Sequence, residues 1–128
     1  MTMEDSIRNF RNQFDFKPVV NNAGKLLVTN KYVIAGMGGS HLGADLVKMR
    51  HPEIDMIIHN DYGLVELPPA SWQDRLVIVI SFSGNTEEVL DVFQNALANN
   101  LPIAAIASGG RLEELAHAHG VPYVRVPN

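Results

Sequence analysis

The sequence predicts an α/β fold in which a doubly wound, five-stranded parallel sheet is flanked by helices. Three observations support this prediction. From residue 32 onward, short apolar runs alternate with segments of helical periodicity, as in consecutive βαβ units. The central runs are continuously aliphatic, as strands buried on both faces require. Two turns rich in glycine and hydroxyl residues follow the first and third runs, at the strand ends where such sheets bind ligands.

The chain opens with an expected helical segment. Ile7, Phe10 and Phe14 recur at helical spacing with charged residues between them, which predicts a short amphipathic helix over 4–16. A proline two residues later prevents its continuation, because the residue before a proline is driven out of the helical region. A second short helix is expected over 19–30, although two asparagines and a glycine in that stretch oppose it.

The sheet and its helices follow in a regular order. The strands are expected over 32–35, 55–59, 76–80, 103–107 and 123–126. The helices between them are expected over 41–50, 86–99 and 111–118. Leu42, Leu46 and Met49 share one side of the first helix, and Gly120 stands where a glycine commonly ends the last one. Right-handed crossovers then place helices on both faces of the sheet.

Length and composition limit the possible functions. The 128 residues suit one domain, with an N-terminal helical segment over 1–27 and the main domain over 28–128. A net charge of −4 and the lack of a basic run argue against nucleic-acid binding. The chain has no cysteine, which excludes disulfides and fits a reducing cytoplasm. No apolar run approaches the roughly 20 residues of a membrane span.

The turn from Ser81 to Glu88 (SFSGNTEE) places three hydroxyl residues and a glycine where a strand meets a helix. The first N–H groups of a helix lack partners within it, and the helix dipole adds positive charge there, so this end attracts anions. Gly84 lets the backbone approach a ligand closely, since it has no Cβ. Ser81, Ser83 and Thr86 can add hydroxyl donors. We interpret this turn as a phosphate-binding loop.

A purely structural interpretation of the same turn remains open. Serine, threonine and asparagine are common helix caps, and Asn85 with Glu88 three residues later resembles a capping box. Glu87 and Glu88 stand near the expected phosphate, where two carboxylates would oppose a bound dianion. For these two residues we favour stabilisation of the first helical turn over catalysis.

The turn over 36–41 (GMGGSH) invites a dinucleotide interpretation. The third glycine of a G-x-G-x-x-G fingerprint would stand where this chain has His41, although Asp61 stands near the place of a ribose-binding acid. No Gly-Lys-Ser/Thr sequence follows, so a Walker motif fails too. We favour a small ligand approached by the glycine backbone and faced by Ser40.

Two stretches carry a resemblance to a known family. VIAGMGGSHLGADLV and, about 40 residues later, SFSGNTEEVLDVF and its continuation to residue 127 resemble the sugar isomerase (SIS) domain. Within that family the likeness is to the N-terminal half of bifunctional phosphoglucose/phosphomannose isomerases. It covers roughly residues 28–128, and the S-x-S-G-x-T-E element is its most specific part. The resemblance implies a flavodoxin-like three-layer sandwich.

The resemblance also implies a ligand and a set of binding residues. The ligand would be fructose 6-phosphate, glucose 6-phosphate or mannose 6-phosphate, interconverted by aldose–ketose isomerisation. The serines and threonine of the second turn would hold the phosphate, and the first turn would line the same pocket. The candidate substrate-binding residues are Gly38, Gly39, Ser40, Ser81, Ser83 and Thr86. We expect a cytoplasmic homodimer that needs no cofactor and no metal.

This chain departs from the family in one respect. The isomerases consist of two such domains, and their catalytic glutamate, histidine and lysine lie in the second, whereas an arginine that assists the substrate lies just past the first. We therefore assign no catalytic residue and expect the 128-residue segment to bind a sugar phosphate without turnover. The alternative is a non-catalytic sugar-phosphate sensor. The acidic residues 1–27 do not resemble the basic helix-turn-helix that usually precedes such sensors.

The histidines predict one possible ligand contact and no metal site. His41 begins a helix near the expected pocket and could contact a sugar hydroxyl. His117 and His119 are two residues apart on one helix, so they face different sides and predict no metal site.

Overall fold

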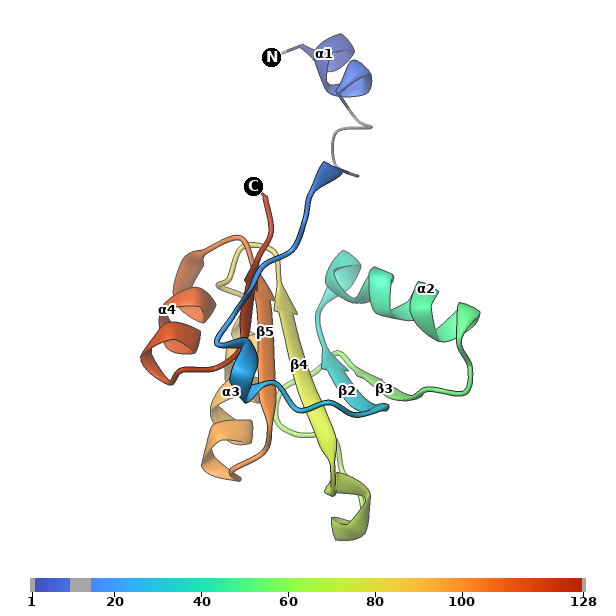
Figure 1. Ribbon diagram of the computed structural model, residues 1–128, viewed down its shortest axis with the longest axis vertical. Coiled ribbons are helices and arrows are strands. Elements are labelled where there is room, and N and C mark those ends of the chain that lie inside the picture. The colour runs from blue at the N-terminus through green and yellow to red at the C-terminus, as the bar shows by residue number, and fades with distance from the viewer. Residues whose placement is uncertain (1, 10–14, 128) are drawn as a thin grey trace.

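The computed structural model describes residues 2–9 and 15–127, and it is built around one six-stranded sheet with the order β1-β6-β5-β4-β2-β3 (Figure 1). Five neighbouring strands are parallel: β2 (Lys31–Ala35), β3 (Asp55–His59), β4 (Arg75–Ser81), β5 (Ile103–Ala107) and β6 (Tyr123–Arg125). The predicted five-stranded parallel sheet is confirmed. Its order reverses between β2 and β4, the point at which doubly wound sheets open a ligand crevice.

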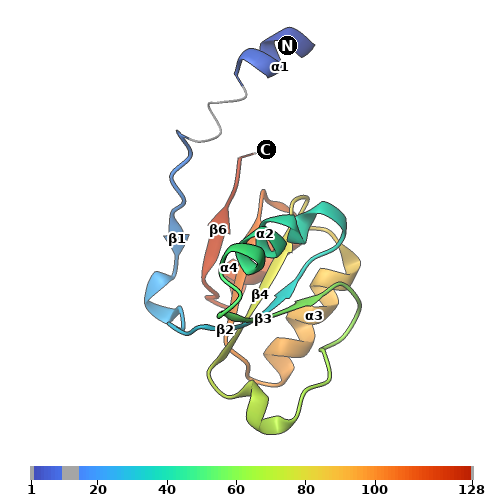
Figure 2. The ribbon, with the colours of Figure 1, turned by 90° about the vertical axis from the view of Figure 1, so that its right-hand side faces the viewer.

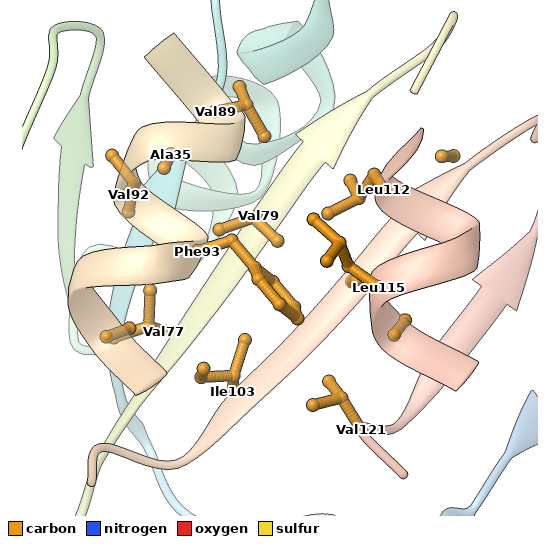
Figure 3. Close-up of a cluster of buried hydrophobic side chains, with 14 of the residues drawn as sticks. Ala35, Val77, Val79, Val89, Val92, Phe93, Ile103, Leu112, Leu115 and Val121 are labelled. Atoms are coloured by element: carbon orange, nitrogen blue, oxygen red, sulfur yellow. The ribbon is translucent and has the colours of Figure 1, made fainter. Parts of the chain in front are cut away.

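Helices lie on both faces of the sheet, as predicted. On one face are α3 (Glu87–Ala98) and α4 (Gly110–Ala118), and on the other is α2 (Leu42–Arg50) (Figures 1 and 2). Because side chains alternate along a strand, every second residue of β4 and β5 points toward α3 and α4. There Val77, Val79 and Phe93 are fully buried in the main core (Figure 3). No helix in the described ranges is both long and apolar enough to cross a bilayer.

The N-terminal segment differs from its prediction. A helix is present, α1 (Met3–Arg8), but none of its residues is buried; Phe10 and Phe14 lie outside the described residues. The helix expected over 19–30 is wrong. That stretch instead forms β1 (Val20–Asn21), antiparallel to β6, and a 3-10 turn, η2 (Ala23–Lys25). Asn22 between them has φ 59°, a left-handed conformation that no regular helix contains.

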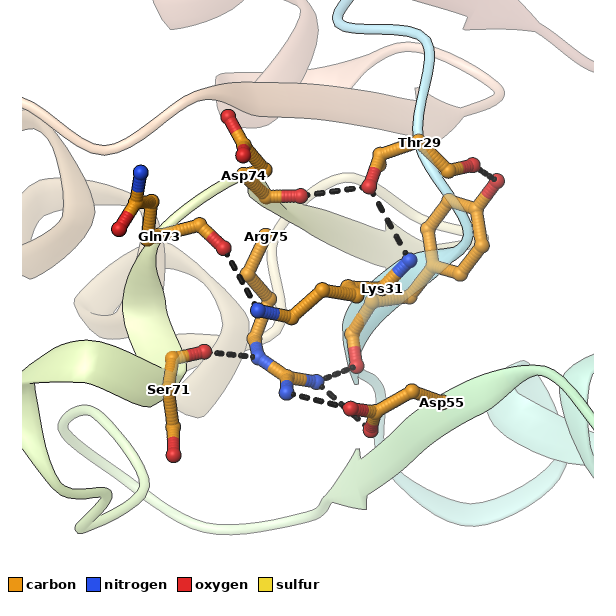
Figure 4. Close-up of polar contacts among 8 residues, drawn as sticks. Thr29, Lys31, Asp55, Ser71, Gln73, Asp74 and Arg75 are labelled. Atoms are coloured by element: carbon orange, nitrogen blue, oxygen red, sulfur yellow. Dashed lines mark hydrogen bonds and ion pairs between the residues drawn. The ribbon is translucent and has the colours of Figure 1, made fainter.

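One buried charge lies at the amino end of β4, whereas the candidate turn with Ser81 lies at the carboxyl end of that strand. Its contacts are shown in Figure 4. Arg75 is only 3% exposed, and its guanidinium pairs with both carboxylate oxygens of Asp55 at 3.0 and 2.8 Å. It also donates to the backbone carbonyls of Ser71 (2.7 Å) and Tyr32 (3.2 Å). The side chain thereby joins β2, β3 and β4 to the 3-10 turn η4 (Pro69–Trp72).

This pair makes stability depend on pH. Hydrogen bonds from Arg75 hold the pKa of the Asp55 carboxyl below its ordinary value. The unfolded chain then binds the proton more readily, so the stabilisation is present above about pH 4 and is lost as pH falls through the lower folded pKa. We expect Asp55→Asn to flatten the fall in unfolding free energy between about pH 5 and pH 3, measured by urea titration at each pH. Parallel curves for the two proteins would contradict this.

Candidate functional site

The turn that follows β4 is shaped by the Ser81 side chain. Ser81 is 1% exposed, and its hydroxyl oxygen accepts from the amides of Gly84 (3.0 Å) and Thr86 (3.4 Å). The same oxygen lies 2.7 Å from the Thr86 hydroxyl oxygen. The Ser81 hydroxyl therefore forms its hydrogen bonds within the turn. This agrees with the structural interpretation of the turn for Ser81.

These bonds set the direction of the hydroxyl protons. The Ser81 oxygen already accepts from backbone amides, which favours donation of its own proton to the Thr86 oxygen. The Thr86 proton is then left for another acceptor. Thr86 is also the N-cap residue of α3, and its side chain makes no capping bond. Buried Ser81 thus leaves the Thr86 hydroxyl as a donor at the start of α3.

The same helix start leaves backbone donors available. The first bond of α3 runs from the Leu90 amide to the Thr86 carbonyl at 3.0 Å. Within the described part of the chain, the amides of Glu87, Glu88 and Val89 form no hydrogen bond. Ser83, which is exposed, accepts from the Asn85 amide at 3.1 Å and keeps its own proton. Three amides and two hydroxyls are therefore free to donate around the end of α3, a composition suited to an anion.

The capping box expected from Asn85 and Glu88 is wrong. The Asn85 side-chain oxygen accepts from the Arg111 amide at 2.9 Å, so this residue caps the neighbouring helix α4 rather than α3. The Gly84 carbonyl accepts from the Leu112 amide at 2.8 Å. The Ser108 amide and hydroxyl both donate to the Phe82 carbonyl, at 3.0 and 2.5 Å. The turn after β4 is thus bonded along its length to the turn after β5.

A hollow of about 460 Å³ opens at the carboxyl ends of the parallel strands. It is lined by Gly39, Ser40, Ile80, Phe82, Ile106, Ala107 and Val126. Of the predicted binding residues, only Gly39 and Ser40 line it. Gly38, Ser81, Ser83 and Thr86 do not, although Phe82 belongs to the same turn as the last three. Gly39 and Ser40 therefore belong to a largely apolar hollow, whereas Ser81, Ser83 and Thr86 belong to the neighbouring start of α3.

Sequence reasoning missed the apolar side of this hollow. Phe82 is 55% exposed at its wall, between the buried Ser81 and the exposed Ser83. The alternation of side chains along an extended segment was the available signal, because it sends Phe82 to the opposite side from its two serine neighbours.

None of the side chains lining the hollow titrates near neutral pH. Nearby, the His41 Nδ1 atom lies 2.6 Å from an Asp45 carboxylate oxygen. Glu87 accepts from the Tyr62 hydroxyl at 3.2 Å, a bond that raises the pKa of Tyr62. Across the described ranges, no three His, Asp or Glu residues group as metal ligands.

Three proteins of known name are similar to this chain in sequence. The chain is 38% identical to the bifunctional phosphoglucose/phosphomannose isomerase of Caldicellulosiruptor bescii over 102 residues, which are 77% of this chain and 29% of that protein. It is 32% identical to the protein of the same name from Aquifex aeolicus over 125 residues, 94% of this chain and 37% of that one. It is also 28% identical to the D-glucosamine-6-phosphate 4-epimerase of Sulfolobus acidocaldarius over 99 residues, 76% of this chain and 30% of that one.

Comparison of structures supports the fold. The Vibrio vulnificus NanR protein, solved in complex with ManNAc-6P, matches 88% of this chain and 46% of its own with a TM-score of 0.54 and 15% identity. No family model matches the sequence. The chain spans only about a third of the length of the relatives it matches.

Proposed function

The chain is a SIS domain homologous to the bifunctional phosphoglucose/phosphomannose isomerases, and from this premise we propose that it binds a hexose 6-phosphate at the start of α3. The substrate would be glucose 6-phosphate, mannose 6-phosphate or fructose 6-phosphate, in the aldose–ketose isomerisation after which the relatives are named. The observation that carries the proposal is the group of free donors around the amino end of α3: three amides and the hydroxyls of Ser83 and Thr86.

The geometry suits a phosphorylated sugar better than a free anion. The donors of the turn would hold the phosphate, while the adjacent hollow, with Gly39, Ser40 and Phe82 in its wall, would receive the sugar carbons. An aromatic face beside an apolar surface favours the C–H side of a pyranose or furanose ring. The names of all three relatives specify a phosphorylated hexose, which supports this class over a dinucleotide.

We propose further that this segment binds without appreciable turnover. Moving a proton between adjacent sugar carbons requires a general base within hydrogen-bond reach, and the lining residues of the hollow supply none. The same observation favours the second candidate function, a non-catalytic sugar-phosphate sensor. A coupled assay tests both proposals together: turnover by the 128-residue chain would contradict both, because each requires that the residues around the hollow cannot move the proton.

Binding itself is tested by calorimetry. We expect fructose 6-phosphate to bind and Ser83→Ala to weaken the binding by about 1–3 kcal/mol, the effect of removing one hydrogen-bond partner of a charged group. Ser71→Ala, at the opposite end of β4, is the matched control and should leave affinity unchanged. If NAD binds more tightly than every hexose phosphate, or if Ser83→Ala leaves affinity unchanged, the assignment of this loop is wrong.

We also propose a homodimer in the cytoplasm. Two-fold dimers are the commonest assembly of soluble proteins, and a cysteine-free sequence suits a reducing compartment. Sedimentation equilibrium at micromolar concentration distinguishes a dimer from a monomer directly.

A further inference from the structure

The second face of the sheet carries an apolar groove that meets the candidate hollow at Ile106, a residue that lines both. On this face, opposite α3 and α4, a cavity of about 360 Å³ is bounded by the 26–29 loop, by β1 and by strands β2, β4, β5 and β6. Its floor includes Tyr32, Leu76, Ile78, Ala104 and Ile106. Parallel sheets are normally covered on both faces. An apolar floor of this kind marks a surface that another element covers.

Two of the large exposed hydrophobic side chains, Leu26 and Val28, line this groove. Twelve large hydrophobic residues are exposed in the described part of the chain, and only Tyr62 and Phe82 lie outside two short regions. Four are on α2, the helix of the same face: Leu42, Leu46, Val47 and Met49. The other six all precede residue 29: Met3, Ile7, Phe16, Val19, Leu26 and Val28.

The helix α1 has an unpartnered apolar side. Met3 and Ile7 are 79% and 69% exposed, and their i, i+4 spacing puts them on one side of the helix. Figures 1 and 2 show α1 standing apart from the sheet. A six-residue helix gains too few hydrogen bonds to be stable alone in water, so its amphipathic pattern calls for a packing surface.

The same segment already contributes one wall of the groove. Val20 of β1 and Leu26 and Val28 of the following loop line it, and β1 is fixed to the sheet by its pairing with β6. Eleven residues separate α1 from β1, enough to span about 35 Å when extended. α1 is therefore joined to a wall of the groove by a short stretch of the same chain.

We propose that α1 of the same chain packs its Met3–Ile7 side into this groove and covers the second face of the sheet. The inference does not rest on sugar-phosphate binding. It accounts together for the open apolar floor, the exposed Met3–Ile7 side of α1 and the exposure of Leu26 and Val28 in the groove wall.

The absence of cysteine permits a direct test on the whole chain. In the variant Ile7→Cys/Val28→Cys, a short bismaleimide reagent should join the two thiols within one chain, detected as one reagent mass per monomer with no free thiol. Reagent-linked dimers would show that a second copy supplies the helix, and unlinked chains would show that the groove has another occupant. Either result would overturn the proposal.

A control pair separates docking from chance encounters between the two cysteines. Glu114 is exposed on α4, on the opposite face of the sheet. Ile7→Cys/Glu114→Cys should therefore link at least several-fold more slowly than the groove pair, and equal rates would overturn the proposal. As a second readout, Ile7→Asp should lower the folding equilibrium constant by about tenfold through loss of apolar burial. Glu4→Gln on the polar side should change it less than twofold.

Discussion

Replacing Gly84 with alanine is expected to destabilise the protein by about 4 kcal/mol or more, enough to leave little folded chain in a domain of this size. Gly84 has φ +79°, which an L side chain rarely adopts, and a Cβ there would overlap the Gly109 carbonyl oxygen. The two turns cannot separate to relieve this overlap without losing hydrogen bonds. The Leu112 amide donates to the Gly84 carbonyl, and the Ser108 amide donates to the Phe82 carbonyl. Chemical denaturation followed by far-UV circular dichroism measures the loss.

Gly43 is the matched control for this substitution. It lies inside α2, has no positive φ, and a Cβ there would meet no atom within 4 Å. Gly43→Ala should therefore stabilise the chain by about 0.5–1 kcal/mol through reduced backbone entropy in the unfolded state. If Gly84→Ala unfolds at the same denaturant concentration as the parent, the close contact between the turns after β4 and β5 does not exist in solution.

Replacing Arg75 with alanine is expected to cost about 3–5 kcal/mol, the usual range when one member of a buried ionic network is removed. The substitution deprives the Ser71 and Tyr32 carbonyls of a donor and Asp55 of its partner. It also leaves a cavity where a 3% exposed side chain had been. The amino ends of β2, β3 and β4 should loosen together, which hydrogen exchange of these strands would detect alongside the shift in the unfolding midpoint.

Two further variants define what is lost at Arg75. Arg111→Ala removes an exposed arginine paired with Glu114 at 3.2 Å and should cost well under about 1 kcal/mol. Asp55→Ala should also destabilise the chain by more than Arg111→Ala, because it leaves the guanidinium of Arg75, a side chain only 3% exposed, without its carboxylate partner. A cost for Arg75→Ala no greater than that of Arg111→Ala would mean that the buried network contributes nothing to stability.

The fold was predictable because its strands and helices have strong, local signals. β4 is an uninterrupted aliphatic run, and α3 repeats apolar residues at helical spacing, so burial on the two sides of each element dictates the alternation of layers. β1 was not predictable, because a two-residue strand has no periodicity and depends on the β6 edge that it joins. A helix was predicted there from weak spacing, and the left-handed Asn22 excluded it.

The candidate site was predictable only in part. Glycine and hydroxyl residues at a strand end identified the turn that proves to carry free hydrogen-bond donors, because these residues are local to it. The hydrogen-bond partners of this turn could not be predicted, because they come from a segment about 26 residues away. Asn85, for example, caps α4 by accepting from the Arg111 amide. The role of Arg75 was not predicted, because the sequence does not show that Asp55 and two backbone carbonyls meet its guanidinium.

The short strand β1 has a consequence for the behaviour of the whole sheet. An exposed edge strand has a row of unpaired amides and carbonyls. Another chain can pair with them, and aggregation begins at such edges. By pairing Val20 with Val124 and Asn21 with Tyr123 in the antiparallel sense, two residues occupy the border of β6. The N-terminal segment therefore covers this edge of β6. A domain that began at residue 28 would leave the edge open to pairing with another chain.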